Sequence, residues 1–551
     1  QGYDRPMYVN VEYAFHDNPP YTNIKVSEAL TGPSPVGSYR RTFTLPEGWE
    51  TRRTILHFDG IYSGAYVWVN GKKVGYTQGG NMDAEFDVTQ YVKAGENNVS
   101  VEVFRWTDGS YLEGQDMFHM SGIHRDVYIY SVPETYAFDH VIRADYSQGY
   151  DNVRLSVTIA AAGKDAEAKT FNVMVLSPDG NIVSYGEATM KTADSIVFEA
   201  DIREPKMWSP EHPDLYTVLI SQTDRTAGEE MAFATKYGFC EVTFDSRLVY
   251  VNGKREYFKG VNTQDTHPVT GRTFDTVTMW QDLTMMKRAN INMVRTSHYP
   301  RTTKMNDMMA YLGLYVCDEA DVECHKNWED GGYIAGAGSW LPAMKDRWTR
   351  MVLRDRNNPA VVMWSMGNES GNGSNFGAGF DLIHRLDPTR PVHYEGATRD
   401  WNKGGYTDIR SSMYPTRRKI DQDLANPTQP TFYCEYEHAM GNSIGNLREL
   451  WDKFYDSPNG IGGCIWDWVD QSIYEPKDIL SGDTIADNGF QKYRSGYDFP
   501  GPHQGNFVNN GIISANRAWS PELTAVKAVY QYIQFNGFDK ETGKVEFRNR
   551  L

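Results

Sequence analysis

Cysteine is scarce in this sequence, with five cysteines among 551 residues. Their number is odd, their positions are scattered, and most of them stand in apolar, strand-like segments. A disulfide framework, or a zinc site built from cysteine alone, needs paired and regularly spaced residues, so neither is expected. We predict free, buried thiols at Cys240, Cys317, Cys324, Cys434 and Cys464.

Long apolar runs are also missing, and the mean hydropathy is -0.58. No segment approaches the roughly 18 apolar residues that a membrane helix needs, so no membrane span is expected. Basic residues are outnumbered: 55 Lys and Arg stand against 72 Asp and Glu, which gives a net charge of -17. That balance opposes binding to a polyphosphate backbone, and nucleic acid is not expected as a partner.

The start of the chain does not identify a compartment. The sequence opens at Gln1, without an initiator methionine and without the apolar core of a signal peptide, which indicates processing or a fragment. The expectation is a soluble protein, with the cytoplasm and the periplasm both left open.

The length predicts several domains, because one domain usually has roughly 100–200 residues. Residues 1–133 read as short strands broken by turns, among them Asn70-Gly71, a strong signal for a type I′ hairpin. Strands continue through 134–240. We expect a jelly-roll-like β domain over 1–133 and an immunoglobulin-like β-sandwich over 134–240.

From residue 241 onward, short apolar strands alternate with helical stretches of ten or more residues, which is typical of βαβ units. About eight strands can be counted, the number that closes a parallel barrel of ~250 residues. The predicted fold is therefore two β-sandwich domains followed by a (β/α)₈ TIM barrel over 241–535. Residues 536–551 read as the start of a further β domain. A connection at about 472–518 is long enough to indicate function.

Polar and charged side chains gather at the ends of the predicted barrel strands, the face on which barrel active sites are built. Glycoside hydrolysis needs one carboxylic acid to protonate the leaving oxygen and one carboxylate to attack the anomeric carbon. Glu369 and Glu435 follow strands on opposite sides of the barrel mouth, although sequence spacing does not measure their separation. For any single residue, the alternative is a helix cap or an ion pair with arginine. The set comprises Asp318, Glu319, Glu323, His325, Asn368, Glu369, Tyr414, Glu435 and His438.

Three motifs carry a resemblance to a known family. "RDRNNPAVVMWSMGNESGNG" resembles the acid/base signature of glycoside hydrolase family 2, and "CEYEHAMGNS" with "GGCIWDWVDQ" resembles the nucleophile region of its long bacterial β-galactosidases. The similarity runs from "GYDRPMYVNVEY" through "GQDMFHMSGIHRDV" and "RTSHYP" to "NNGIISANR", nearly the whole chain. Full-length relatives carry sequence before residue 1 and further β domains after residue 551, so this chain is similar to their central part.

The resemblance implies a retaining exo-β-galactosidase. Glu369 is matched to the acid/base and Glu435 to the nucleophile, with Asn368 as the partner of the sugar 2-hydroxyl. Tyr414 is matched to the phenol that donates a hydrogen bond to the nucleophile. His298 corresponds to the histidine that assists the transition state.

Further matched positions bind the sugar in relatives. Trp466 corresponds to the aromatic floor under the galactosyl ring, although tryptophan is also often buried for packing alone. His438 resembles the histidine that contacts the galactosyl group. The resemblance makes residues 1–133 a sugar-binding domain and an oligosaccharide the expected substrate. Relatives are often homo-oligomers, and that state stays open for this chain.

The motif "DVECH" places Glu323 and His325 two positions apart on a predicted extended strand, and so on one side of it. Together with Glu369 they match the magnesium site of the family. Oxygen-rich ligation with one imidazole suits a hard divalent ion such as Mg²⁺ or Mn²⁺ better than zinc. A hydrogen-bonded Glu–His pair without a metal is the alternative.

A sodium site is implied by the resemblance alone. Asp116, on a loop of the first domain, matches an aspartate that in relatives reaches the barrel and binds Na⁺ and the sugar hydroxyls. Asn510 and Phe507 resemble its companions. Without the resemblance, Asp116 would be interpreted as a residue of a surface loop.

Two positions depart from the family pattern. Gln264 in "GVNTQDTHP" stands where the family has histidine, and Ser34 in "PSPVG" stands where it has asparagine. Both positions touch the sugar in relatives, so the sugar is less well determined than the reaction. The paired Asn and Lys that hold the carboxylate in β-glucuronidases do not follow "WDWVD", which argues against a uronic acid.

Two alternatives to β-galactoside hydrolysis stay open at this point. The first is the same mechanism acting on another neutral β-hexoside, or on galactose-ended oligosaccharides from an unusual polysaccharide. The second belongs to another class: a non-catalytic carbohydrate-binding protein, since a fold alone does not establish function. Binding alone, however, has no need for two carboxylates that face each other.

Overall fold

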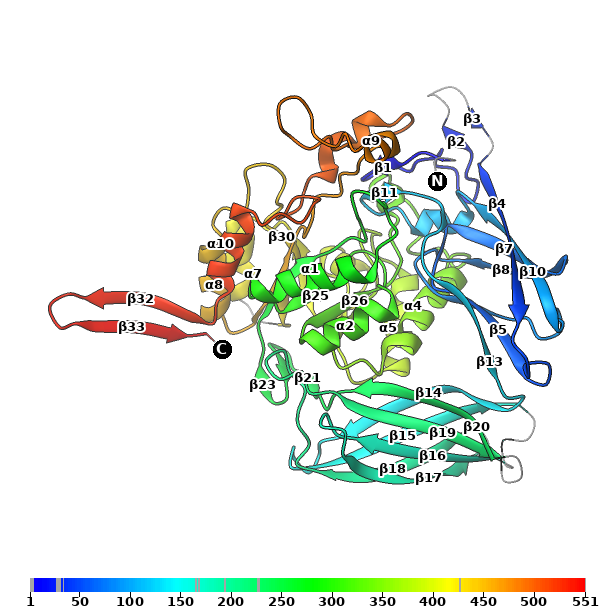
Figure 1. Ribbon diagram of the computed structural model, residues 1–551. Coiled ribbons are helices and arrows are strands. Elements are labelled where there is room, and N and C mark those ends of the chain that lie inside the picture. The colour runs from blue at the N-terminus through cyan, green and yellow to red at the C-terminus, as the bar shows by residue number, and fades with distance from the viewer. Residues whose placement is uncertain are drawn as a thin grey trace.

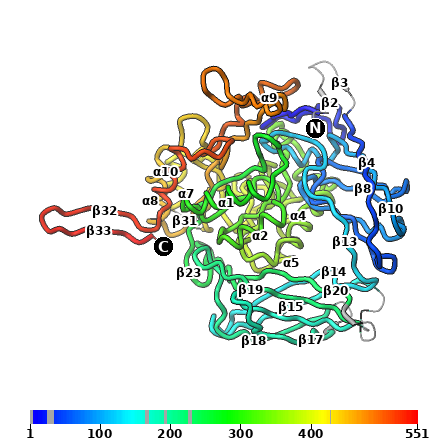
Figure 2. The backbone as a smooth tube through the Cα atoms, in the orientation of Figure 1, coloured from blue at the N-terminus to red at the C-terminus, as the bar shows by residue number. Residues whose placement is uncertain are grey.

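The computed structural model describes residues 4–25, 31–32, 34–163, 166, 169–192, 195–224, 228–425 and 428–550. Figure 1 shows two β domains packed against different sides of a central barrel, which confirms the predicted fold class. The backbone tube in Figure 2 follows the same order, from the first domain in blue through the second in cyan to the barrel in green and yellow. Within the ranges described, no helix has both the length and the apolar character to cross a bilayer.

The first domain has two main antiparallel sheets. One has the order β4-β10-β7-β8 and the other the order β13-β5-β9. The turn between β7 and β8 is the predicted Asn70-Gly71 hairpin, with both residues at positive φ, 50° and 77°. The strands are β4 (Val36–Leu45), β5 (Arg53–Phe58), β7 (Gly64–Val69), β8 (Lys72–Gln78), β9 (Ala84–Asp87), β10 (Gly95–Phe104) and β13 (Val127–Val132).

The second domain is a seven-stranded antiparallel arrangement in the order β14-β15-β18-β17-β16-β19-β20. Every second residue of β15 from Val153 to Ile159 is buried, the period expected of a strand with one face on a core. The strands are β14 (Tyr136–Asp145), β15 (Asn152–Ala162), β16 (Lys169–Leu176), β17 (Ile182–Thr192), β18 (Ser195–Arg203), β19 (Tyr216–Asp224) and β20 (Gly228–Tyr237).

The barrel has eight parallel strands in the order β28-β27-β26-β25-β24-β31-β30-β29, and a bridge from His393 to Ile409 joins its two ends. Most strands are buried along their full length, because helices cover the outside and side chains fill the inside. The strands are β24 (Phe258–Asn262), β25 (Met293–Arg295), β26 (Tyr315–Glu319), β27 (Val361–Ser365), β28 (Val392–His393), β29 (Arg410–Met413), β30 (Thr431–Tyr436) and β31 (Gly460–Ile465).

Helices around the barrel begin and end at residue types that favour helix ends. Asp275 caps α1 by accepting from Thr278 N, and α2 ends at Gly313 in the left-handed conformation. The helices are α1 (Thr276–Arg288), α2 (Thr303–Leu312), α3 (His325–Glu329), α4 (Leu341–Asp355), α5 (Ser374–Leu386), α6 (Glu395–Arg399), α7 (Arg417–Ala425), α8 (Leu447–Asp456), α9 (Pro476–Ser481) and α10 (Pro521–Tyr530).

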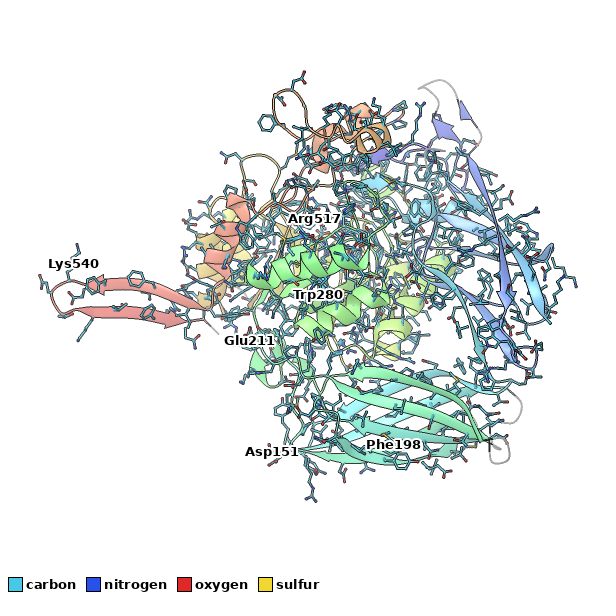
Figure 3. All side chains as sticks on the ribbon, in the orientation of Figure 1. Asp151, Phe198, Glu211, Trp280, Arg517 and Lys540 are labelled. Carbon is cyan, nitrogen blue, oxygen red and sulfur yellow. The ribbon has the colours of Figure 1, made fainter. Side chains whose placement is uncertain are left out.

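The long connection at 472–518 is not without structure, because it contains α9 and two short 3-10 turns. It returns to the barrel at Arg517, labelled in Figure 3, whose guanidinium donates to both carboxylate oxygens of Asp282 on α1 at 3.1 Å. After α10 the chain forms a hairpin of β32 (Ile533–Asp539) and β33 (Lys544–Asn549), which extends away from the barrel in Figure 1. The hairpin spans the predicted boundary at 535/536, and a further β domain stays a prediction.

Small strands complete the fold. They form the pairs β1-β11, β6-β12 and β2-β3 and the three-stranded β21-β22-β23. Their bounds are β1 (Met7–Val9), β2 (Ile24–Lys25), β3 (Thr31–Gly32), β6 (Ile61–Tyr62), β11 (Met117–His119), β12 (Gly122–Ile123), β21 (Val242–Phe244), β22 (Val249–Val251) and β23 (Lys254–Arg255). The cysteines carry no disulfide, and all except the partly buried Cys240 are buried.

Candidate active site

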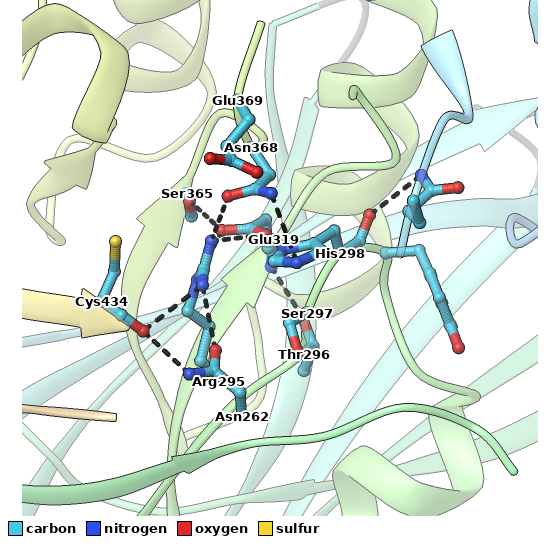
Figure 4. Close-up of polar contacts among 12 residues, drawn as sticks. Asn262, Arg295, Thr296, Ser297, His298, Glu319, Ser365, Asn368, Glu369 and Cys434 are labelled. Atoms are coloured by element: carbon cyan, nitrogen blue, oxygen red, sulfur yellow. Dashed lines mark hydrogen bonds and ion pairs between the residues drawn. The ribbon is translucent and has the colours of Figure 1, made fainter. Parts of the chain in front are cut away.

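Arg295, the last residue of β25, lies at the centre of the polar side chains at the carboxyl end of the barrel (Figure 4). Its Nε and Nη2 donate to the two oxygens of Glu319 at 2.8 and 3.0 Å. Nη1 donates to Glu435 Oε1 at 2.9 Å, and Nη2 donates to Asn368 Oδ1 at 3.0 Å. One guanidinium therefore connects the ends of strands β26 and β30 and the segment after β27.

Arg295 and Glu319 form an ion pair, and both residues are fully buried. Burial by itself would raise the pKa of Glu319, but Arg295, His298 and the Ser365 hydroxyl hold it at about 2, below the ordinary 4.5. Glu319 is thus a fixed negative charge that keeps Arg295 in place, and Arg295 keeps donors directed at Glu435 and Asn368.

Both oxygens of Glu435 have a hydrogen-bond donor. Oε1 accepts from Arg295, and Oε2 accepts from the hydroxyl of Tyr414 at 2.7 Å. His298 Nε2 lies 3.6 Å from Oε1. The carboxylate is buried near the end of β30, and the hydrogen bonds from Arg295 and Tyr414 set its orientation.

His298 and Trp466 form a flat stack beside Glu435. Their ring centroids are 5.1 Å apart and the planes differ by 10°. His298 Nδ1 lies 2.7 Å from Glu319 Oε1, and its Nε2 lies 3.3 Å from the Asn368 amide nitrogen. The structure thus brings together His298, Trp466, Asn368 and Glu435, all of which the sequence marked as site residues.

Glu369 follows Asn368 and lies at the same mouth. His325 Nδ1 is 2.9 Å from Glu369 Oε2. Burial alone would raise the pKa of Glu369, but the contact with His325 holds that pKa below its ordinary value. Ligand atoms of Glu323, His325 and Glu369 all lie within 4.8 Å of one another. The three residues predicted as one group are therefore adjacent.

The predicted extended strand through Glu323 and His325 is wrong in its second half. β26 ends at Glu319, and Glu323 is joined to its neighbours by single β-bridges. His325 is instead the first residue of the short helix α3, because the chain turns at Cys324. The two side chains converge through this turn and not through strand alternation.

Glu323 is a buried carboxylate that protein groups do not fully satisfy. Burial, together with Glu369 and Glu435, raises its pKa well above the ordinary value. Among the residues that the structure describes, Glu323 Oε2 has no hydrogen-bond donor. A buried acceptor of this kind needs either a proton or a cation.

Asp116 reaches this mouth from the first domain and is buried. Its carboxylate accepts from the hydroxyl of Tyr8, and its backbone carbonyl accepts from Gln264 Nε2 and Gln471 Nε2, both at 3.4 Å. Burial and the nearby Glu435 raise the pKa of Asp116 to about 7. Its predicted position as a loop residue that meets the barrel agrees with this geometry.

Asn510 and Phe507 belong to the long connection, and His438 follows β30. Asn510 is fully buried, and within the described ranges neither atom of its amide has a hydrogen-bond partner. Phe507 is exposed, and its ring lies 6.4 Å from the ring of His438. The His438 ring lies 5.7 Å from the ring of Tyr414.

The two departures from the family pattern have different surroundings. Gln264 is buried, and Tyr299 donates to its Oε1 at 3.0 Å while its Nε2 donates to the Asp116 carbonyl. One amide hydrogen of Gln264 is left for another partner. Ser34 lies just before β4, and its hydroxyl accepts from Trp106 N at 3.2 Å.

Sequence reasoning missed several residues that organise this site. Arg295 stands inside "RTSHYP", and the strand-end position could have identified it. Glu319 was noted without a role, although it is the main partner of Arg295. Tyr8 and Gln471 carry no local signal, because their partner Asp116 is 108 and 355 residues away along the chain.

The arrangement suits acid/base chemistry at a sugar. A carboxylate with both oxygens oriented, Glu435, lies in the same mouth as a second carboxyl group, Glu369, and an aromatic stack flanks it. Such a pair can protonate a leaving oxygen and attack the carbon that it leaves.

Three family models match the chain in succession. They are the sugar binding domain of glycosyl hydrolases family 2 over residues 1–133, the glycosyl hydrolases family 2 domain over 135–239, and the family 2 TIM barrel domain over 242–535. Together they account for nearly all of the sequence.

A curated β-galactosidase of Priestia megaterium (strain DSM 319 / IMG 1521) is 37% identical over 574 residues, an alignment that covers 100% of this chain and 54% of the relative. The chain therefore spans about half the length of that relative.

Solved β-glucuronidases share the architecture. That of Bifidobacterium dentium, complexed with coumarin-3-O-glucuronide, has a TM-score of 0.73 and 21% identity over 90% of this chain and 88% of its own. That of Bacteroides uniformis has a TM-score of 0.74 and 19% identity over 91% and 64%. At these identities the similarity shows the fold alone.

Proposed function

Because this chain belongs to glycoside hydrolase family 2 and is a glycoside hydrolase, we propose that it removes terminal non-reducing β-D-galactose from oligosaccharides with retention of configuration. The observation that carries the proposal is the carboxylate of Glu435, oriented by Arg295 and Tyr414 in the same mouth as Glu369. The 37% identity to a β-galactosidase supports galactose as the sugar.

The proposed reaction has two steps. Glu369 gives its proton to the glycosidic oxygen while a Glu435 oxygen attacks the anomeric carbon, so the C–O bond to the leaving group breaks as the ester bond forms. Glu369 then takes a proton from water, whose oxygen attacks the same carbon and releases Glu435. Asn368 and His298 face the sugar in this scheme, and Trp466 forms its floor.

A neutral sugar fits this mouth better than a uronic acid. The solved β-glucuronidases share the fold, but the Asn–Lys pair expected for a sugar carboxylate does not follow "WDWVD" in this chain. A sugar carboxylate would enter a mouth that already holds the carboxyl groups of Glu435, Glu369 and Asp116, and a further group of the same charge is disfavoured there. Another neutral β-hexoside, or a galactose-ended oligosaccharide of an unusual polysaccharide, is the second candidate substrate.

Two cations are part of the proposal. The residues Glu323, His325 and Glu369 fit Mg²⁺, since their ligand atoms lie within 4.8 Å and Glu323 Oε2 lacks a donor within the described part of the chain. When bound, Mg²⁺ would supply positive charge beside Glu369. Na⁺ would be held by Asp116, Asn510 and Phe507. The buried amide oxygen of Asn510, which has no donor among the described residues, fits that role.

The remaining proposals concern partners. The substrate is an oligosaccharide, nucleic acid is not a partner, and a homo-oligomer fits the habit of the relatives. The compartment is either the cytoplasm or the periplasm.

A covalent label tests the reaction. A 2-deoxy-2-fluoro-galactosyl inhibitor should lose its leaving group and add one 2-deoxy-2-fluoro-galactosyl group to the peptide that contains "CEYEH", and Glu435→Gln should abolish the adduct. NMR of the first product should show the β anomer. An adduct on another peptide, or an α anomer as first product, would contradict the mechanism. Turnover of a β-glucuronide in preference to a β-galactoside would contradict the sugar.

Metal binding can be followed without activity. Mn²⁺ should bind in a 1:1 ratio, detected by the loss of free-ion EPR signal, and His325→Ala should weaken that binding by at least about tenfold. A matched control is His384→Ala, which removes an imidazole paired with Asp408 on the barrel exterior. Equal Mn²⁺ binding by the unchanged chain and His325→Ala would contradict the proposed ligands.

A further inference from the structure

The first β domain enters the barrel mouth through one loop, residues 112–116. Glu323 N donates to Leu112 O at 2.7 Å, and Gly114 N donates to Glu323 O at 3.0 Å. On its other side Glu323 is bridged to Asn368. At the edge of the catalytic mouth, the loop therefore pairs through an isolated β-bridge with the segment that carries a proposed magnesium ligand.

Three buried polar side chains hold the loop against the barrel. Gln115 Nε2 donates to Asp321 Oδ1 at 2.8 Å, and Asn81 Nδ2 donates to Asp321 Oδ2 at 3.1 Å. Arg272 Nη2 donates to Asn81 Oδ1 at 2.6 Å, which fixes the orientation of that amide. We name Asn81, Gln115 and Asp321 the Asp321 latch; each of its three side chains is 0% exposed.

The latch lies next to two residues of the active site. Gln115 immediately precedes Asp116, and its Nε2 also lies 3.4 Å from the backbone carbonyl of His298. The side-chain amide of Gln115 thus contacts both the Asp321 carboxyl group and the backbone of His298, and Gln115 is bonded directly to Asp116 in the chain. A movement of Gln115 would move both neighbours.

We infer that the Asp321 latch is a positioning device for the sugar-binding side of the active site, with Gln115 and Asp321 as positioning residues. It fixes Asp116 and His298 relative to Glu435, which is oriented separately by Arg295 and Tyr414. The inference rests on the proposed function, because the roles of Asp116 and His298 belong to it.

The burial of Asp321 makes the latch effective. Its two carboxyl oxygens each accept from a buried amide, and the loss of one donor leaves a buried oxygen without its partner, which costs more than the loss of an exposed hydrogen bond. Both donors belong to the first domain, while the acceptor belongs to the barrel. Without the Gln115 donor, the loop would keep its backbone pairing but lose its side-chain link to His298 and Asp321.

Gln115→Met tests the inference, since methionine has a similar size and no N–H donor. A misplacement of about 1 Å costs on the order of 10²-fold in rate, so kcat/KM should fall by about 10²-fold. KM should rise through Asp116 and kcat should fall through His298. Asp321→Asn keeps an acceptor oxygen for Gln115 but replaces the oxygen that Asn81 donates to with an NH₂ group. The loss of kcat/KM should therefore be smaller than in Gln115→Met, within about tenfold of the unchanged chain.

The matched control is Asp126→Asn. Asp126 pairs with Lys304 at 3.1 Å across the same two domains, but both side chains are at least half exposed. Such exposed pairs contribute little, so this variant should keep the kinetics of the unchanged chain. All four proteins are compared in full length, on the aryl glycoside that the unchanged chain hydrolyses fastest.

Hydrogen–deuterium exchange gives a second measurement that needs no turnover. Amides of residues 112–116 should exchange at least about tenfold faster in Gln115→Met, and not in Asp126→Asn, at an unchanged midpoint of thermal unfolding. Unchanged exchange there, or a kcat/KM within twofold of the unchanged chain, would overturn the inference. If the unchanged chain hydrolyses no glycoside, the proposed function fails, and the exchange rates alone decide the latch.

Discussion

Replacing Glu319 with glutamine should remove a contribution to stability that depends on pH. Glu319 is fully buried, and against the effect of burial Arg295 and His298 lower its pKa from 4.5 to about 2. One pKa unit corresponds to about 1.4 kcal/mol, so the ionised carboxylate stabilises the folded chain by roughly 3 kcal/mol at neutral pH.

The sign follows from the lower pKa in the folded state. The unfolded chain binds the proton more readily, so the stabilisation is fully present above about pH 4.5 and is lost as the pH falls toward about 2. Glu319→Gln has no such group at any pH. The difference in the free energy of unfolding between the two proteins should therefore be roughly 3 kcal/mol at pH 7 and shrink below pH 4.5.

Urea unfolding at pH 7, 5, 4 and 3, followed by tryptophan fluorescence, measures that difference. Glu134→Gln serves as the control, because Glu134 is exposed and its partner Arg53 is only partly buried. A difference that does not change with pH would refute the reasoning, since it would assign the effect to packing. A difference at pH 7 below about 1 kcal/mol would refute the claim that the ionised Glu319 stabilises the folded chain through its pairing with Arg295.

Three further predictions concern catalysis. Glu369→Gln should lower kcat/KM about 10²–10⁴-fold on substrates with poor leaving groups and far less on activated aryl galactosides; equal losses would remove it as proton donor. Tyr414→Phe deletes the 2.7 Å hydrogen bond to Glu435 and should lower kcat about 10–100-fold at unchanged thermal stability; full activity would contradict its role. Gln264→His should raise kcat/KM several-fold on lactose and less on a galactose-ended tetrasaccharide, because an imidazolium forms a stronger hydrogen bond to a sugar hydroxyl than an amide does. An equal loss on both substrates would mean that Gln264 instead holds the loop at Asp116 through its hydrogen bond to the Asp116 carbonyl.

The fold could be predicted from the sequence where local patterns are strong. The run "VVMWS" forms β27 and is buried at every position, as an apolar run in a parallel sheet should be. Prediction was weaker where tertiary contacts decide. In "PVHYEG" only Val392 and His393 form a strand, and the chain enters α6 at Glu395.

The residues proposed for the reaction could be predicted from the sequence, but the side chains that orient them could not. Glu369 and Glu435 could be proposed because the sequences around them resemble the motifs of the family, although a single glutamate is not specific to any reaction. The partners that orient them depend on the folded chain: Tyr414 meets Glu435 only after a turn with φ 43° at Tyr414. Arg295 resembles any arginine at a strand end until its neighbours are known.

The loop at 112–116 has a consequence for engineering. The three bodies in Figure 1 look like interchangeable modules, yet the catalytic mouth is shared between two of them. A barrel cut out at residue 242 would lack Tyr8 and Asp116 and would leave the edge at Glu323 unpaired. A chimaera that takes its first domain from a relative must keep matching residues on both sides of this contact, in the loop at 112–116 and in the barrel segment at Glu323. Otherwise the active site lacks the residues that the first domain contributes.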